Sequence, residues 1–154
     1  MMTEFPENSI TILLVESARM MRNLVDSALA DAGLDLTPGE ARALAYASRS
    51  SAIRPGVLAA QMSIDPMTLN GHLERLESRG LVDRQPDPDD GRAKLVRITP
   101  AAKPVLALVF QVTERVRGSA LRGISVKEEE QLRDLLRRMR SNIAAQEGRP
   151  PKPD

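Results

Sequence analysis

Three successive helix starts in the middle of the chain each place a proline in the first helical turn. They are Thr37-Pro38, Arg54-Pro55 and Asp65-Pro66. Proline is tolerated there because the amide hydrogen that it lacks would have no partner inside the helix. Glu40 also completes a capping box with Thr37. The middle of the chain is therefore predicted to contain three short helices, and Gly80 is predicted to stop the third.

Residues 81–99 change from helical spacing to strand spacing. Residues 81–85 are predicted to form a strand, and residues 94–98 alternate polar and apolar side chains as a returning strand does. Between them, residues 86–91 are a dense cluster of proline, aspartate and glycine, which favours a turn. The segment is predicted to be a β-hairpin with a long, charged tip.

The two ends of the chain are predicted to be long amphipathic helices. Apolar residues recur at helical spacing over residues 10–32, and a capping box from Ser125 to Glu128 opens a last helix with a leucine-rich stripe. Between them, Thr99-Pro100 opens another helix, which is expected either to begin properly at Pro104 or to bend there. The apolar surfaces at the two ends are wide, so part of them is expected to pack against a partner chain.

Composition excludes several classes of function. The 154 residues contain no cysteine and one histidine, His72, which excludes disulfides, thiolate metal sites and a multi-histidine metal site within one chain. The sequence contains no nucleophile–base pair, phosphate-binding glycine loop or metal-ligand cluster, so neither an enzyme nor a bound cofactor is expected. No apolar run is long enough to span a membrane, and the first residues do not resemble a signal peptide. A cytoplasmic location is expected.

The charge of the chain is balanced. Its formal net charge is +1, and residues 55–99 carry six basic and seven acidic side chains. The basic excess lies in residues 100–154, with eleven basic and seven acidic side chains. Taken as a whole, the chain is therefore not a strongly basic nucleic-acid binder.

The order of the expected elements is that of a winged helix-turn-helix. The sequence also resembles the multiple antibiotic resistance regulator (MarR) family over about residues 10–146. The residues that carry this resemblance are Leu36-Thr37-Pro38, the segment Leu73 to Arg84 with its Gly80-Leu81-Val82, and Asp90-Gly91-Arg92 followed by Ile98-Thr99. The combination of these motifs is specific for the family, whereas each motif alone would be weak evidence.

The resemblance implies a mainly α fold with a small β-hairpin wing, assembled as an intertwined homodimer. It divides the chain into an N-terminal dimerisation helix (residues 1–35), a winged helix-turn-helix domain (36–100), C-terminal dimerisation helices (101–147) and a disordered tail (148–154). It further implies a transcriptional regulator, expected to be a repressor, that binds a pseudo-palindromic site on double-stranded DNA. A small organic effector is expected to modulate it. The alternative is a dimeric ligand-binding or protein-interaction module with little DNA affinity.

The positions that usually meet DNA in the family fall here on Asp65, Met67, Thr68, Asn70 and Gly71, and Asp90 and Arg92 match its wing motif. Helical spacing adds Arg75 as an outward-facing residue, and Arg84 is a further predicted contact. Arg92 would reach a phosphate or the minor groove, and Asp90 would orient it. Gly71 departs from the family, which often has arginine there, so specificity is expected to rest on Thr68, Asn70 and the wing. Asp65 is interpreted as a helix cap.

Three of these interpretations have alternatives. Arg75 either contacts a phosphate or is solvated surface, because no acidic residue lies three or four positions away in its own helix. Arg84 contacts the DNA backbone or forms a salt bridge within the wing. His72 contacts DNA or has a partly buried structural role.

Overall fold

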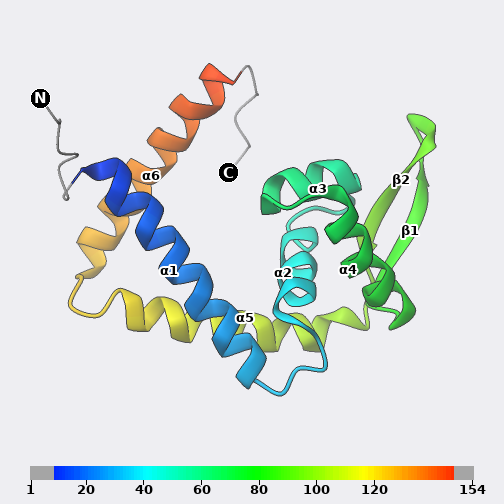
Figure 1. Cartoon of the computed structure of the whole chain (residues 1–154), viewed down its shortest axis with the longest axis horizontal. Coiled ribbons are helices and arrows are strands. Elements are labelled where there is room, and N and C mark those ends of the chain that lie inside the picture. The colour runs from blue at the N-terminus through cyan, green and yellow to red at the C-terminus, as the bar shows by residue number, and fades with distance from the viewer. Residues whose placement is uncertain (1–8, 148–154) are drawn as a thin grey trace, which may run out of the picture. The chain divides into compact units, whose positions relative to one another are not determined.

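The computed structural model describes residues 9–147, and Figure 1 labels the helices and strands of this part in chain order. They are α1 (Ile10–Asp31), α2 (Pro38–Ala47), α3 (Pro55–Met62), α4 (Pro66–Ser78), β1 (Val82–Asp87), β2 (Asp90–Ile98), α5 (Ala102–Ala120) and α6 (Val126–Gln146). The chain divides into two compact units, the first ending at Val116 and the second beginning at Arg117. The predicted disordered tail lies outside the described residues.

Short side-chain caps begin most of the helices. The capping boxes predicted at Thr37 and Ser125 are both formed, and the Asp65 carboxylate caps α4. Each cap satisfies backbone N–H groups that have no partner within the helix. In α3, Arg54 occupies the cap position without a capping bond from its side chain. A guanidinium has only donors, so it cannot accept from the first N–H groups of a helix.

A continuous apolar core lies between α2, α3, α4 and the hairpin, which are close together in Figure 1. Leu69, Leu73 and Leu76 turn the same side of α4 toward this core, and Val96 of β2 closes it. Burying one leucine side chain contributes about 1.5–3 kcal/mol, so this stripe fixes which face of α4 remains outside. We call residues 37–98, from the cap of α2 to the end of β2, the winged-helix region.

The hairpin has longer strands and a shorter tip than predicted. β1 continues through Pro86 to Asp87, and β2 already begins at Asp90, so that only Pro88 and Asp89 separate the strands. The prediction of a long tip was wrong because prolines were counted as turn residues. Pro86 is accommodated beside a register shift, where the ladder is irregular. Two backbone hydrogen bonds between Ile53 and Val96, of 3.0 and 2.8 Å, join β2 to the segment before α3.

The alternative that α5 begins at Pro104 was wrong. The helix begins at Ala102, so Pro104 lies in the first turn, where its missing amide hydrogen breaks no helical bond. Val109 and Val112 of α5 pack with Leu29 of α1 and Ala41 of α2 in a second, smaller apolar cluster. This cluster connects α1 and α5 to the winged-helix region.

The second unit consists of the end of α5 and α6. No side chain of α6 is buried, although the predicted apolar stripe is present. Its large exposed members are Leu132, Leu135, Leu136 and Ile143. Glu129, near the start of this helix, forms ion pairs with Arg117 and Arg133 at 2.7 and 2.8 Å.

Candidate nucleic-acid interface

The outer face of α4 carries most of the predicted DNA contacts. Because Leu69, Leu73 and Leu76 face the core, Met67 and Asn70 point to solvent, and Met67 is 85% exposed. Gly71 leaves a gap on this face. A Cβ built at Gly71 would have one heavy-atom neighbour within 4 Å, Nη1 of Arg75 at 3.7 Å.

Thr68 is bonded to the helix cap. The Asp65 carboxylate accepts a 2.9 Å hydrogen bond from the Thr68 amide, and the Thr68 hydroxyl donates to its other oxygen. These two bonds, that of the hydroxyl being the stronger influence, hold the pKa of Asp65 below its usual value. The interpretation of Asp65 as a cap is therefore confirmed. Thr68 remains exposed, and its hydroxyl oxygen retains capacity to accept.

Asn70 and Arg84, which were predicted separately, are bonded to each other. Nη1 of Arg84 donates to the Asn70 side-chain oxygen at 3.0 Å, and the Asn70 amide donates to Glu74 at 2.8 Å. Arg84 also lies 3.3 Å from the Glu77 carboxylate. Arg84 thus forms a salt bridge, but its partner lies in α4 and not within the wing as the alternative specified. This network joins β1 to the outer face of α4.

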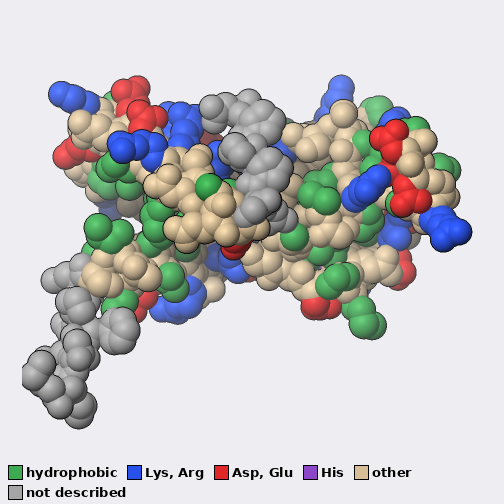
Figure 2. Space-filling view, turned by 90° about the horizontal axis from the view of Figure 1, so that it is seen from above, with side chains coloured by type: hydrophobic (Ala, Val, Ile, Leu, Met, Phe, Trp, Pro, Cys, Tyr) green, Lys and Arg blue, Asp and Glu red, His purple; other side chains and the backbone are tan. Residues whose placement is uncertain are grey.

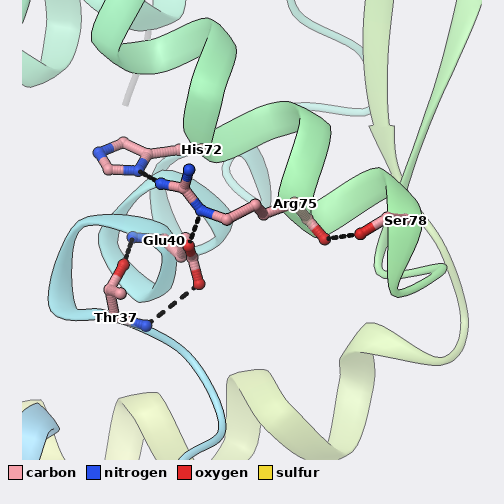
Figure 3. Close-up of polar contacts among 5 residues, drawn as sticks. All are labelled: Thr37, Glu40, His72, Arg75 and Ser78. Carbon is pink, nitrogen blue, oxygen red and sulfur yellow. Dashed lines mark hydrogen bonds and ion pairs between the residues drawn. The ribbon is translucent and has the colours of Figure 1, made fainter.

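Arg75 forms an ion pair with Glu40 of α2, which Figure 3 shows. The Arg75 Nε donates to one Glu40 oxygen, and the Thr37 amide donates to the other at 3.1 Å. The Glu40 side chain is only 5% exposed. Burial by itself raises the pKa of Glu40, but the bonds from Arg75 and Thr37 outweigh it and hold the pKa below its usual value. Neither alternative considered for Arg75 included this partner.

His72 lies on the other side of the same guanidinium. Its Nδ1 is 3.1 Å from the Arg75 Nη2, and since arginine can only donate, Nδ1 is the acceptor. Burial, followed by the charges of Arg75 and Arg42, lowers the pKa of His72 against the opposing influence of Glu40. The imidazole is therefore neutral at neutral pH. His72 is half-buried, as its structural alternative requires.

Gly39 makes the position of the His72 ring possible. A Cβ at residue 39 would lie 2.6 Å from Nε2 of His72, closer than real Cβ atoms approach. A side chain at this position would push the ring away from α2. Gly39, His72, Arg75 and Glu40 consequently form one packed contact between α2 and α4, which we call the Arg75 cluster.

The base of the hairpin tip is fixed to the start of α3. The Asp87 carboxylate, 4% exposed, accepts from Nε of Arg54 at 2.6 Å and from the Asp89 amide at 2.9 Å. The Asp89 amide is the largest influence lowering the pKa of Asp87, with Arg54 contributing after it despite the opposing effect of burial. Arg54 thus holds the hairpin tip from the cap position of α3, where a guanidinium, which has no acceptor, cannot itself cap the helix.

Asp90 and Arg92 lie just beyond that anchor. Asp90 accepts a 3.1 Å hydrogen bond from the Arg92 backbone amide, so it orients the Arg92 backbone and not its guanidinium. Arg92 is exposed, and its guanidinium has no hydrogen bond or ion pair within residues 9–147. It is the arginine of the predicted set whose charge is not already engaged by the protein.

The charge beside the outer face of α4 is mixed, since Arg75 and Arg84 lie next to Glu40, Glu74 and Glu77. The surface drawn in Figure 2 also carries lysine and arginine side chains interspersed with aspartate and glutamate. Within the described residues there is no group of three or more histidines and acids placed to hold a metal ion. No helix in the described part of the chain is long and apolar enough to cross a membrane.

Sequence analysis missed three residues of these contacts: Glu40 as an ion-pair partner, Arg54 and Asp87. A signal existed for Glu40, since it precedes Leu44 and Ala47 at spacings of four and seven and thus lies on the buried face of α2. A buried carboxylate requires a cationic partner. Nothing in the sequence pairs Arg54 with Asp87, because the two are 33 residues apart.

Three helices followed by a two-stranded wing define a winged-helix protein. A sequence profile of the MarR family matches residues 36–94. A probable transcriptional regulator from Pseudomonas aeruginosa is 31% identical with a TM-score of 0.65, over 86% of this chain and 98% of that chain. A MarR-family regulator from Rhodococcus sp. RHA1 is 27% identical with a TM-score of 0.75, over 89% and 96%.

The chain is also similar to CouR from Rhodococcus jostii RHA1, with 28% identity and a TM-score of 0.70 over 89% of this chain and 95% of that chain. In its crystal structure, CouR is bound to p-coumaroyl-CoA. The chain belongs to the MarR family of transcriptional regulators. The resemblance noted from the sequence and the predicted winged-helix fold are both confirmed.

Proposed function

We propose that this protein is a sequence-specific DNA-binding regulator that acts as a homodimer and represses transcription. The observation that carries the proposal is the geometry of α4. Its apolar stripe fixes it on the core, and the opposite face, with Met67 and Asn70, stands free in solvent. A helix held in this way fits the major groove, where base pairs present distinct patterns of donors and acceptors.

Two sets of residues make the proposed contacts. Met67, Thr68, Asn70, Gly71 and Arg75 of α4 enter the major groove, and Arg84, Asp90 and Arg92 place the wing along the backbone. Arg92 contributes most to the wing contact, because its charge has no partner among the described residues and is exposed. Asp90 contributes indirectly, through the backbone turn that presents Arg92.

The proposed dimer rests on the apolar side chains that the chain leaves exposed. Large ones lie along α1 and α6, among them Ile10 at 77% and Val126 at 75% exposure. An apolar face of this extent on two long helices marks a protein interface. A second copy of the chain is the proposed partner, and the two α4 helices would then meet successive turns of a pseudo-palindromic site. The domain boundaries expected from the sequence belong to this proposal: dimerisation through residues 1–35 and 101–147, and DNA binding through residues 36–100.

A small organic effector is proposed to modulate DNA binding. CouR, which is similar over most of its length, is bound to p-coumaroyl-CoA in its crystal structure. The proposal also includes a cytoplasmic location and no catalytic activity.

The mixed charge of the winged-helix region favours a second function, a dimeric ligand-binding or protein-interaction module with little DNA affinity. Several arginines of the candidate interface are paired with acids of the same chain, including Arg75 with Glu40 and Arg84 with Glu77. Such pairs weaken the attraction of the surface for phosphates. The two functions differ in how affinity for DNA depends on salt.

Selection from a random-sequence pool of duplexes, followed by fluorescence anisotropy, separates them. A regulator selects a pseudo-palindromic duplex, binds it more tightly than a scrambled duplex of equal length, and loses affinity steeply with salt. A protein that enriches no sequence and binds both duplexes weakly at low salt contradicts the proposed function and supports the module.

A further inference from the structure

The Arg75 cluster places a guanidinium over the gap that Gly71 leaves on the outer face of α4. Helical side chains lean toward the N-terminus of the helix, so residue 75 covers the surface beside residue 71. Its Nη1 lies 3.7 Å from where a Cβ of residue 71 would be. A positive group therefore lies in van der Waals contact with the position where residue 71 would carry a side chain.

This guanidinium is held from two directions. Nε donates to Glu40, and Nη2 contacts Nδ1 of His72 at 3.1 Å. Glu40 is itself fixed, since its second oxygen accepts from the Thr37 amide at 3.1 Å in the capping box of α2. The anchor therefore comes from the rigid start of a neighbouring helix and not from a mobile surface acid.

The hydrogen-bonding edges of Arg75 are used unequally. Nε and one side of Nη2 are engaged, whereas Nη1 makes no hydrogen bond within residues 9–147. We call Nη1 and the unused hydrogen of Nη2 the free edge of Arg75, whose side chain is 55% exposed. Two parallel N–H groups are what a guanine requires, because its O6 and N7 accept a bidentate pair from arginine. Holding the side chain beforehand reduces the rotamer entropy lost on binding.

We propose that Glu40 is a positioning residue for base recognition, which holds Arg75 over Gly71 so that its free edge reads a guanine in the major groove. The inference rests on the proposed function and deepens it. The proposal assigns part of the base specificity to Arg75, whereas sequence analysis had assigned it to Thr68, Asn70 and the wing. It also differs from simple neutralisation, in which Glu40 would only reduce the attraction of Arg75 for DNA.

The test uses the full chain and the duplex that it selects from the random pool. Each guanine in a half-site is replaced in turn by 7-deazaguanine, which lacks the N7 acceptor, and binding is measured by anisotropy. For the wild type, one replacement per half-site is expected to weaken binding about ten-fold. The same replacement is expected to cost less than about two-fold in Arg75→Ala and in Glu40→Gln.

Three further variants keep the test decisive. Glutamine is accepted at this position of a capping box, so Glu40→Gln preserves the start of α2, which circular dichroism checks. Arg75→Lys keeps the charge but loses the planar fork, so it is expected to lose guanine discrimination while keeping affinity for the scrambled duplex.

Asp35→Asn is the matched control. Asp35 also pairs with an arginine, Arg79 at 2.7 Å, but this arginine follows α4 and is away from Gly71. It is expected to discriminate as the wild type does. A double variant, Glu40→Gln with Arg75→Ala, is expected to be no worse than Arg75→Ala alone.

Several results would overturn the inference. Full discrimination in Arg75→Ala would mean that Arg75 reads no guanine. Full discrimination in Glu40→Gln, with tighter binding to both duplexes, would mean that Glu40 neutralises Arg75 without positioning it. In both cases the wild type still selects a DNA sequence, so the proposed function stands. A wild type that selects no sequence overturns the proposed function and this inference together.

Discussion

The winged-helix region and α6 have comparable apolar patterns and opposite burial. In the winged-helix region, Leu69, Leu73 and Leu76 repeat at helical spacing and are 0–1% exposed. In α6, Leu132, Leu135 and Leu136 repeat in a similar way, yet each is more than 40% exposed. Both helices also begin with a well-formed cap.

The difference shows that local sequence makes the helix, whereas topology decides what covers it. α4 closes its core with α2, α3 and the hairpin of its own chain. α6 lies in a unit of two helical segments, which is too small to cover its stripe. The winged-helix region is therefore expected to be stabilised within one chain, and α6 by association with a second copy. Four predictions test this contrast, in order of decreasing effect.

The largest effect is expected from truncating the core of the winged-helix region. Leu73→Ala removes a fully buried side chain and should lower the free energy of unfolding by about 2–5 kcal/mol, measured by urea denaturation at fixed protein concentration. Leu135→Ala in α6 is the comparison. If Leu73→Ala cost no more than Leu135→Ala, the two regions would not differ as described.

The second prediction concerns association. Leu135→Asp places a charge within the apolar stripe of α6 and should raise the dimer dissociation constant by about 100-fold, measured by sedimentation equilibrium. Ser141→Asp introduces the same charge on the opposite side of the helix and should leave the constant unchanged. Equal effects of the two substitutions would argue against an interface along this stripe.

The third prediction compares two single charges. Arg92→Ala should weaken binding to the selected duplex about ten-fold and reduce the salt dependence by about one phosphate contact per chain. Arg19→Ala removes an equal charge from α1 and should change neither quantity. Similar losses in both variants would mean that overall charge, and not the wing, governs binding.

The smallest effect concerns His72, whose lowered pKa makes the folded chain bind its proton less readily than the unfolded chain does. Below about pH 6.5 the unfolded state therefore gains protons first, and the free energy of unfolding falls as the pH drops toward the lowered pKa. His72→Gln should lack this component when both proteins are compared by urea denaturation from pH 7.5 to 5. Parallel curves for the two proteins would contradict the assignment.

Much of the fold could be predicted from the sequence because its signals are local. The caps at Thr37, Asp65 and Ser125 and the stripe of α4 require only neighbouring residues. The prediction of a long hairpin tip was wrong because Pro86 and Asp87 are residue types that favour turns. Their place in β1 depends instead on pairing with Lys94 and Asp90 of β2. That pairing, and the Arg54 contact to Asp87, are tertiary.

The candidate site was predictable in its positions and not in its contacts. Thr68, Asn70, Arg75 and Arg84 lie on or beside the outer face of α4, as helical spacing and the order of the elements predict. Each of these residues has an acidic partner, and the partner could be inferred only where it is near in the sequence, as Asp65 is to Thr68. The other partners are Glu74, Glu40 and Glu77. Glu40 is 35 residues from Arg75, so its contact depends on how α2 packs against α4.

Sedimentation velocity of the wild type with its selected, fluorescently labelled duplex tests the central claim most directly, because it reports DNA binding and assembly together. The account predicts one complex at 150 mM salt whose mass equals one duplex and two chains. A scrambled duplex should sediment free under the same conditions. A complex with a single chain would contradict the role given to α6, and a selected duplex that sediments free would contradict DNA binding by the winged-helix region.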